Sequence, residues 1–143
     1  MNVLRWILAL ILAGLFLFMA SFKFMPEITS EANPIFPLLA ERTGIALIEP
    51  YFRWLTGAME IITALLLIAP RTRMMGAGLG FLILLGALIA HFSPYLGIDI
   101  PGVGKFVFYM AIGMAVLTWL VLSLGVGSRK KTHAETSADY DLG

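Results

Sequence analysis

One acidic residue, Glu60, lies inside a long apolar stretch of the chain. The stretch covers residues 54–70 and reads WLTGAMEIITALLLIAP. A carboxylate inside a membrane segment costs a few kcal/mol on insertion scales, and such a group usually faces a helix-bundle interior or a wet cavity. Glu60 therefore predicts a polar site inside the protein, together with a partner for its charge.

Basic residues near the ends of the apolar stretches are the candidate partners of Glu60. The predicted ligand-binding or polar-pocket residues are Lys23, Arg53, Glu60, His91, Lys105 and Tyr109. We expect Glu60 to be ionised beside one of the cations and to hold a proton without one. Three plainer alternatives stay open: an ion pair that only joins two helices, a Lys23 that snorkels to the interface, and a His91 that caps its helix.

The sequence motifs of common enzyme classes are absent. There is no HExxH, no Ser/His/Asp set, no phosphate-binding glycine loop and no carboxylate pair, so no metal site is predicted. The absence of cysteine excludes thiol chemistry and disulfides within the chain, and one histidine outside the tail excludes a bis-histidine haem. A quinone needs only an apolar slot with one or two hydrogen-bonding groups, so this cofactor stays open. We expect the chain to be, at most, a membrane subunit of a quinone-linked oxidoreductase.

Composition sets the class of protein that must position these residues. The chain has 143 residues, of which 59% are hydrophobic and 13% are charged. Soluble domains carry about 25% charged residues, so this composition indicates a membrane protein of one domain. The formal net charge of +1 gives no reason to expect a nucleic-acid partner.

Four apolar runs predict four membrane spans. They cover residues 3–25, 51–69, 74–92 and 106–126, and each approaches the roughly 20 residues that cross a hydrocarbon core. We predict an all-α, polytopic transmembrane four-helix bundle over residues 1–127. The first run is longer than the ~7–15 apolar residues of a signal peptide, so it is predicted to stay as a helix. Residues 128–143 are polar and are predicted to form a disordered cytoplasmic tail.

The connection from residue 26 to residue 50 is long and apolar, and it contains several prolines. Pro37 is predicted to open a short helix that ends near Gly44. This outer loop between the first two spans is therefore partly helical, and it lies in the membrane interface or covers the bundle as a lid.

Small residues predict where the helices approach closely. Gly57 lies one turn before Glu60, and Gly76 and Gly80 form a small-xxx-small pair in the third span. A short internal repeat is also visible, since Lys23-Phe24-Met25-Pro26 and His91-Phe92-Ser93-Pro94 both close an outward-running span. We treat a duplicated helical hairpin as a hypothesis.

Charge distribution predicts the orientation of the bundle. One side of the membrane would hold both termini and the cations Arg5, Arg71, Arg73, Arg129, Lys130 and Lys131. The cations of the other side are accompanied by five acidic residues. The positive-inside rule therefore predicts cytoplasmic termini, and the pocket around Glu60 would open to the extracytoplasmic side.

The order of these features resembles a known family. The matching residues are Lys23-Phe24, Gly57-Ala58-Met59-Glu60-Ile61, the run from Ala64 to Pro70, Arg73-Met74-Met75-Gly76-Ala77, and Gly86-Ala87 with His91. Over residues 1–125 the chain is similar to the DoxX/DoxD-like membrane proteins. The resemblance implies a small four-helix protein of the bacterial inner (cytoplasmic) membrane. It also implies association with quinol oxidase or thiosulfate:quinone oxidoreductase complexes or with redox-stress assemblies, and Lys23, Gly57, Glu60 and His91 match the family pattern.

Three functional hypotheses remain open at this point. The first is an accessory or quinone- or lipid-associated subunit with a pocket around Glu60. The second is a small proton-coupled transporter, and the third is a structural or chaperone-like assembly protein. The expected partners are the lipid bilayer, other membrane subunits or further copies of the chain, and a hydrophobic small molecule or lipid.

Overall fold

Helices form nearly all of the regular structure in the described part of the chain. The computed structural model describes residues 2–25 and 34–140, with side chains described for residues 3–25 and 34–125. The helices are α1 (Asn2–Phe24), α3 (Ile35–Thr43), the π-helical turn η1 (Ile48–Phe52), α4 (Arg53–Ile68), α5 (Arg73–Phe92) and α6 (Phe106–Tyr140). Four segments are long and apolar enough to cross a membrane: Val3–Phe24, Ile48–Ile68, Arg73–Phe92 and Phe106–Gly125. The predicted all-α transmembrane four-helix bundle is confirmed.

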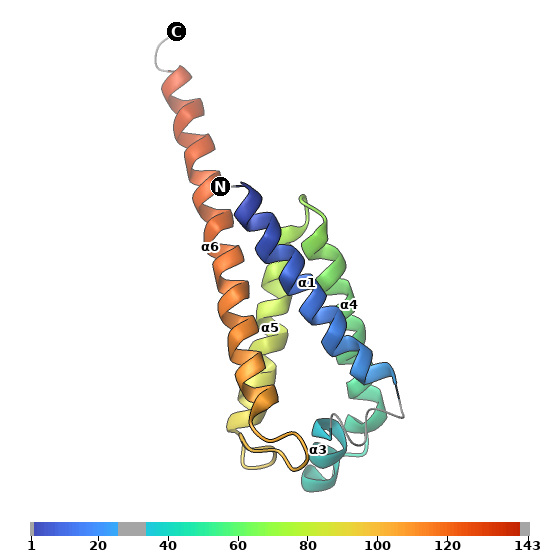
Figure 1. The fold of residues 1–143 in the computed structure, drawn as a ribbon. Coiled ribbons are helices and arrows are strands. Elements are labelled where there is room, and N and C mark those ends of the chain that lie inside the picture. Colours follow the sequence, from blue (N-terminus) through green and yellow to red (C-terminus); the bar gives the residue numbers. More distant parts are fainter. Residues whose placement is uncertain (1, 26–33, 141–143) are drawn as a thin grey trace.

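The four long helices alternate in direction (Figure 1). Helices α1 and α5 run toward the end of the bundle that carries α3, and α4 and α6 run back from it. A short turn joins α4 to α5, so these neighbours must pack antiparallel, as in other up-down bundles. The start of α1 and the α4–α5 turn therefore lie at the end of the bundle opposite α3. We call these two ends the α3 end and the terminal end.

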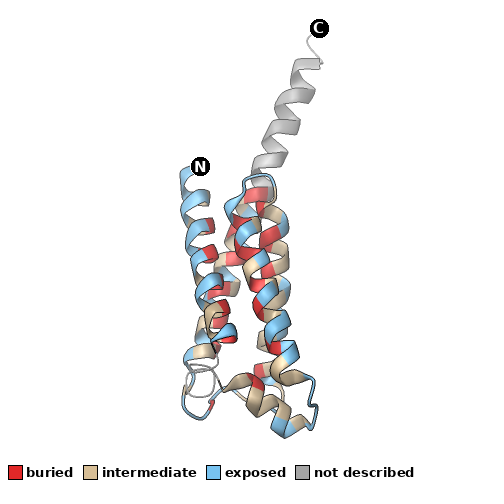
Figure 2. Cartoon of the chain, turned by 90° about the vertical axis from the view of Figure 1, so that its right-hand side faces the viewer, coloured by how far each residue is buried: buried red, intermediate tan, exposed pale blue. Residues whose placement is uncertain are grey.

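The surface of the bundle is as apolar as its interior. Buried residues lie on the inner faces of the helices, and the outer faces are exposed (Figure 2). Large hydrophobic side chains such as Leu65, Ile89 and Trp119 are exposed. Water would penalise such a surface, whereas lipid tails match it. The chain is therefore a multi-pass membrane protein.

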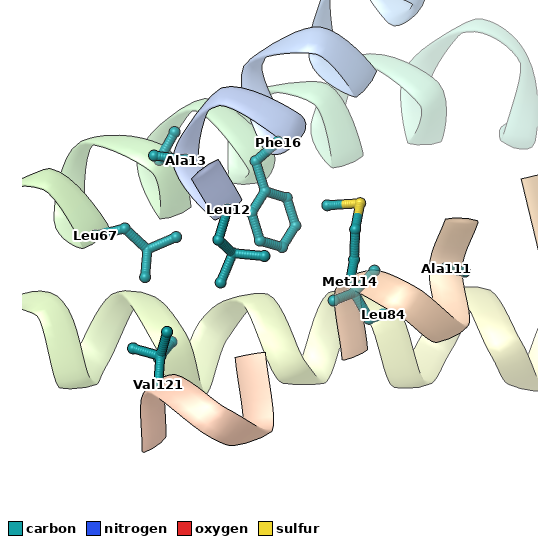
Figure 3. Packing of buried hydrophobic residues seen from close by; sticks show 10 residues of the cluster. Leu12, Ala13, Phe16, Leu67, Leu84, Ala111, Met114 and Val121 are labelled. Carbon is teal, nitrogen blue, oxygen red and sulfur yellow. The ribbon is translucent and has the colours of Figure 1, made fainter. Parts of the chain in front are cut away.

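The buried core joins all four long helices. Leu12 and Phe16 of α1 point toward Met114 and Val121 of α6, with Leu67 of α4 beside them (Figure 3). Leu12, Phe16 and Val121 are fully buried. This cluster fills the space between the four long helices.

Glycines let the helix backbones approach one another. A Cβ atom added to Gly76 would lie 2.8 Å from the backbone nitrogen of Leu67, and one added to Gly80 would lie 2.8 Å from the ring of Phe16. At Gly57 the nearest atom would be in the ring of Phe24, at 2.7 Å. These distances are too short for a real Cβ, so the observed packing requires glycine at the three positions that the sequence pattern indicated.

The outer connection contains the expected short helix. Helix α3 begins at Ile35, two residues before the predicted start, and Pro37 lies in its first turn, where a missing amide hydrogen costs no helical bond. It ends at Gly44, whose φ of 72° is left-handed and whose amide donates to the Ala40 carbonyl at 2.9 Å. Residues 26–33, which belong to the same predicted loop, lie outside the described residues.

Helix α6 continues beyond the predicted end of the last span. The span was expected to end at residue 126, and a disordered tail was expected from residue 128. The structure differs, because α6 is helical as far as Tyr140. Residues 126–140 contain no proline and include Arg, Lys, Ala and Glu, which all favour helix, so nothing in this segment interrupts the hydrogen-bond ladder.

Candidate functional site

Lys23 is the partner of Glu60. Its Nζ atom lies 2.8 Å from both carboxylate oxygens, and the two side chains are 5% and 7% exposed. The same ammonium lies 3.4 Å from the Met19 carbonyl and 5.9 Å from the centre of the Phe36 ring. A buried charge is tolerated when it is paired and hydrogen-bonded, and this pair meets both conditions.

The position of Gly57 brings the two charges together. Glu60 lies on the buried face of α4 with Gly57 and Ala64, three and four residues away. Lys23 lies in the last turn of α1. A Cβ at Gly57 would come within 3.1 Å of the Lys23 Cβ atom. The absence of a side chain at residue 57 therefore lets the end of α1 approach α4 closely enough for the ion pair.

Arg53 supports this site without contacting Glu60. Its side chain is buried, and its Nε donates to the two oxygens of Glu49 at 2.8 and 2.9 Å. Its Nη1 donates to the main-chain carbonyl of Lys23. That carbonyl belongs to the last turn of α1, which has no later helical residue to bond to it. Arg53 thus holds the end of α1 in place and forms a second ion pair.

His91 faces the same region from the end of α5. It is 2% exposed, and its Nδ1 lies 2.9 Å from the carbonyl oxygen of Gly97 in the following loop. Because a carbonyl only accepts, Nδ1 donates this hydrogen bond, and Nε2 is the ring nitrogen that is left for another partner. The ring also packs edge-on to Phe108, with 5.5 Å between centroids. His91 therefore anchors the α5–α6 loop, as in the capping alternative, and also faces the site.

A cavity of about 370 Å³ contains the inward-facing groups. Lys23, Thr56, Glu60 and His91 are its polar lining residues, and the remaining lining is apolar or glycine. Its walls come from α1, α4, α5 and α6, while Phe36 and Leu39 of α3 lie across the α3 end. The tertiary structure thus joins Lys23, Glu60 and His91, which are far apart in the sequence, around one apolar space.

The cavity has an opening on the side of the bundle. Leu82 and Gly86 of α5 and Phe52 of η1 line the cavity and are also exposed on the outer surface. Leu82 and Gly86 lie on α5 and Phe52 directly precedes α4, so the exposed part of the cavity lining belongs to α5 and to the segment before α4. In a bilayer this opening faces acyl chains rather than water.

Three of the predicted pocket residues do not line the cavity. Arg53 is buried but is not among the lining residues. Lys105 and Tyr109 are exposed and do not line the cavity, and Tyr109 packs against Phe108 with 5.7 Å between ring centroids. The actual wall from α6 consists of Val107, Met110, Ala111 and Met114. Sequence reasoning missed these residues because every face of this helix is apolar, so its hydrophobic pattern carries little rotational information.

No metal centre is built into the described part of the chain. The described residues contain no group of three or more His, Cys, Asp or Glu side chains that could hold an ion.

The placement of Lys23 and His91 agrees with the repeat hypothesis, because each is buried near the end of a helix that runs toward α3. The duplication of the helical hairpin stays a hypothesis.

Comparisons with protein-family models, curated proteins and solved structures found no match to the chain. The assignment of the site therefore depends on its own geometry.

Proposed function

We propose that this protein binds a lipophilic molecule with a polar head group, of the quinone or lipid class, in the cavity beside Lys23 and Glu60. The cavity itself carries the proposal. Its volume of about 370 Å³ falls within the roughly 300–1,000 Å³ of small-molecule sites, and a few polar groups at one part of an apolar wall are typical of such sites. The lateral opening gives a molecule dissolved in the bilayer a direct route to the cavity.

The polar groups fit an oxygen-bearing ring or head group. Lys23 has three donor hydrogens, and the Thr56 hydroxyl both donates and accepts. In the structure these hydrogens already point at the two Glu60 oxygens and the Met19 carbonyl, and the Thr56 hydroxyl donates to the Phe52 carbonyl. A carbonyl oxygen of the ligand would therefore replace the Met19 carbonyl, whose 3.4 Å contact is the longest that Lys23 makes. The Thr56 oxygen can still accept from a hydroxyl of the ligand. Nε2 of His91 can form a hydrogen bond with a hydroxyl, the group that replaces the carbonyl when a quinone is reduced. The apolar residues Met59, Ile83 and Met110 would contact the rest of the molecule.

Binding is better supported than proton-coupled transport. A carrier of that kind would need Glu60 to gain and lose a proton during each cycle. Glu60 is instead held by two hydrogen bonds of 2.8 Å from the Lys23 ammonium, which make it one member of a buried ion pair. We therefore propose an accessory membrane subunit in which the Lys23–Glu60 pair is a fixed part of the site. Copurification of a stoichiometric membrane partner would support the accessory role.

We further propose that the protein belongs to the DoxX/DoxD-like group and lies in the bacterial inner membrane with cytoplasmic termini. The support is the residue pattern around Glu60 and the gathering of Arg5, Arg71 and Arg73 toward the terminal end. A C-terminal alkaline phosphatase fusion tests the orientation. An inactive phosphatase with an active cytoplasmic reporter at the same position is expected, and the reverse pattern would contradict the proposed topology.

The binding proposal is tested by filling the cavity. Ala87 lines the cavity, whereas Ala58 is exposed on α4, so Ala87→Leu and Ala58→Leu add the same atoms inside and outside the site. The assay measures equilibrium binding of a short-chain quinone to the protein in nanodiscs, with empty nanodiscs subtracted. Saturable binding is expected in the wild type and in Ala58→Leu, with a loss of at least about tenfold in Ala87→Leu because the ligand and the added side chain would overlap. Equal binding by both variants would refute the site. If lipid is extracted from the purified protein and Ala87→Leu lowers its amount, the ligand is a lipid rather than a quinone.

A further inference from the structure

A second cluster of polar groups lies at the terminal end of the bundle, away from the cavity. Arg73 is the first residue of α5 and is 4% exposed. Its Nε donates to the Leu67 carbonyl at 3.0 Å, and its guanidinium carbon lies 3.9 Å from the centre of the Trp6 ring. The side chain is therefore held between α1, α4 and α5.

Both arginines in this cluster have buried nitrogen atoms without a partner. Nη2 of Arg73 and Nε of Arg5 are buried and make no hydrogen bond. Arg5 extends from α1 toward α6, because a Cβ added to Gly125 would lie 2.9 Å from its Nη2 atom. The positive charges of Arg5 and Arg73 are close enough to repel each other. Two guanidinium groups with unused donors thus converge among α1, α5 and α6.

Among residues 3–25 and 34–125, whose side chains the structure describes, no carboxylate forms an ion pair with Arg5 or Arg73. The two ion pairs of this part of the chain, Lys23–Glu60 and Arg53–Glu49, are formed by other residues toward the α3 end. The remaining acidic residues with described side chains, Glu41 and Asp99, belong to α3 and to the α5–α6 loop. Buried donors without partners and like charges without a counter-ion both destabilise the folded protein, so an external anion would stabilise it.

The start of α5 adds further donors. Thr72 precedes the helix, but its side chain makes no capping hydrogen bond to it. The Thr72 hydroxyl instead donates to the Leu66 carbonyl at 3.1 Å. The first amide groups of α5 are therefore uncapped by this side chain, and the partial positive charge of a helix N-terminus favours an anion beside them.

We propose that Arg5, Arg73 and the first turn of α5 bind a phosphate group of the kind that anionic phospholipids carry. Guanidinium groups match phosphate oxygens in charge and geometry. Arg73 begins one candidate span and Arg5 lies two residues inside another, which is the depth at which lipid head groups lie. The site is separate from the cavity near α3 and does not depend on the function proposed for it.

The test uses native mass spectrometry of the full chain in detergent. The probes are phosphatidylglycerol and diacylglycerol with the same acyl chains, together with inorganic phosphate in a thermal-unfolding assay. Arg5→Gln removes one charge and keeps the Arg73–Leu67 hydrogen bond. Arg71→Gln is the matched control, because Arg71 lies in the same region and is exposed. Arg73→Lys keeps the charge of Arg73 while removing its planar donor group.

The wild type is expected to retain more phosphatidylglycerol than diacylglycerol. Arg5→Gln is expected to lower the ratio of bound phosphatidylglycerol to bound diacylglycerol about fivefold. Arg71→Gln is expected to keep the wild-type preference, and Arg73→Lys to lose part of it. Stabilisation by inorganic phosphate that Arg5→Gln abolishes would also support the site and would indicate free phosphate as its ligand. Equal retention of both lipids without a phosphate effect, or equal losses in Arg71→Gln and Arg5→Gln, would overturn the proposal.

Discussion

The buried pair of Lys23 and Glu60 makes a strong prediction about stability. Glu60→Gln removes the negative charge and leaves the Lys23 ammonium at 4% exposure without a carboxylate. Two charges about 4 Å apart attract by about 4 kcal/mol at an effective dielectric constant near 20. Removing one partner of a buried ion pair typically costs about 3–5 kcal/mol. We therefore expect Glu60→Gln to lower the free energy of unfolding by about 3–5 kcal/mol.

The assay is reversible unfolding in mixed micelles, followed by tryptophan fluorescence, with three proteins compared to wild type. Glu60→Gln and Lys23→Met each break the pair, and the double variant Lys23→Met/Glu60→Gln removes both charges. Because the double variant leaves no uncompensated ion, we expect it to cost less than Glu60→Gln alone. Arg53 keeps its own hydrogen bonds in all three variants, so the end of α1 stays attached to α4.

Two outcomes would refute this reasoning. A cost below about 1 kcal/mol for Glu60→Gln would mean that water or another group already solvates Lys23, since such a small loss is typical of exposed pairs. A cost for the double variant equal to the sum of the single costs would mean that the charges are not coupled. The 2.8 Å contacts would then have no energetic consequence.

Three further substitutions test the packing around the site, each by the free energy of unfolding. Gly76→Ala should cost about 1–3 kcal/mol, because its Cβ would meet the backbone of Leu67. Gly78→Ala is the control and should cost nothing, because a Cβ at Gly78 meets open space. Equal costs for the two variants would contradict the close α4–α5 contact. Phe108→Ala should cost about 3–5 kcal/mol because this buried ring packs against His91, and a cost typical of a surface residue would show that the ring is not part of the core. Arg53→Gln should cost about 1–3 kcal/mol through the lost charge-assisted bonds, and an unchanged stability would argue against its role at the end of α1.

The sequence determined the class of protein and the positions of its helices. Each span is recognisable from the length and apolarity of one local segment, so residues 74–92 and the observed span Arg73–Phe92 agree within one residue. The buried face of α4 was also readable, because Gly57 and Ala64, three residues before and four residues after Glu60, put small residues on the same face as the carboxylate. The end of α6 could not be predicted in the same way. The segment after residue 126 has helix-forming residues but lacks the apolar signal of a span.

Only the tertiary structure decided which cation pairs with Glu60 and which residues line the cavity. Arg53 lies on the same helix as Glu60, yet the partner is Lys23, 37 residues away in the sequence. In a membrane bundle both the core and the outer surface are apolar, so hydrophobic periodicity does not fix the rotation of α6. The sequence therefore could not predict that Lys105 and Tyr109 are exposed. Close contacts at Gly57, Gly76 and Gly80 fix how α1, α4 and α5 face one another, and these contacts exist only when the helices are assembled.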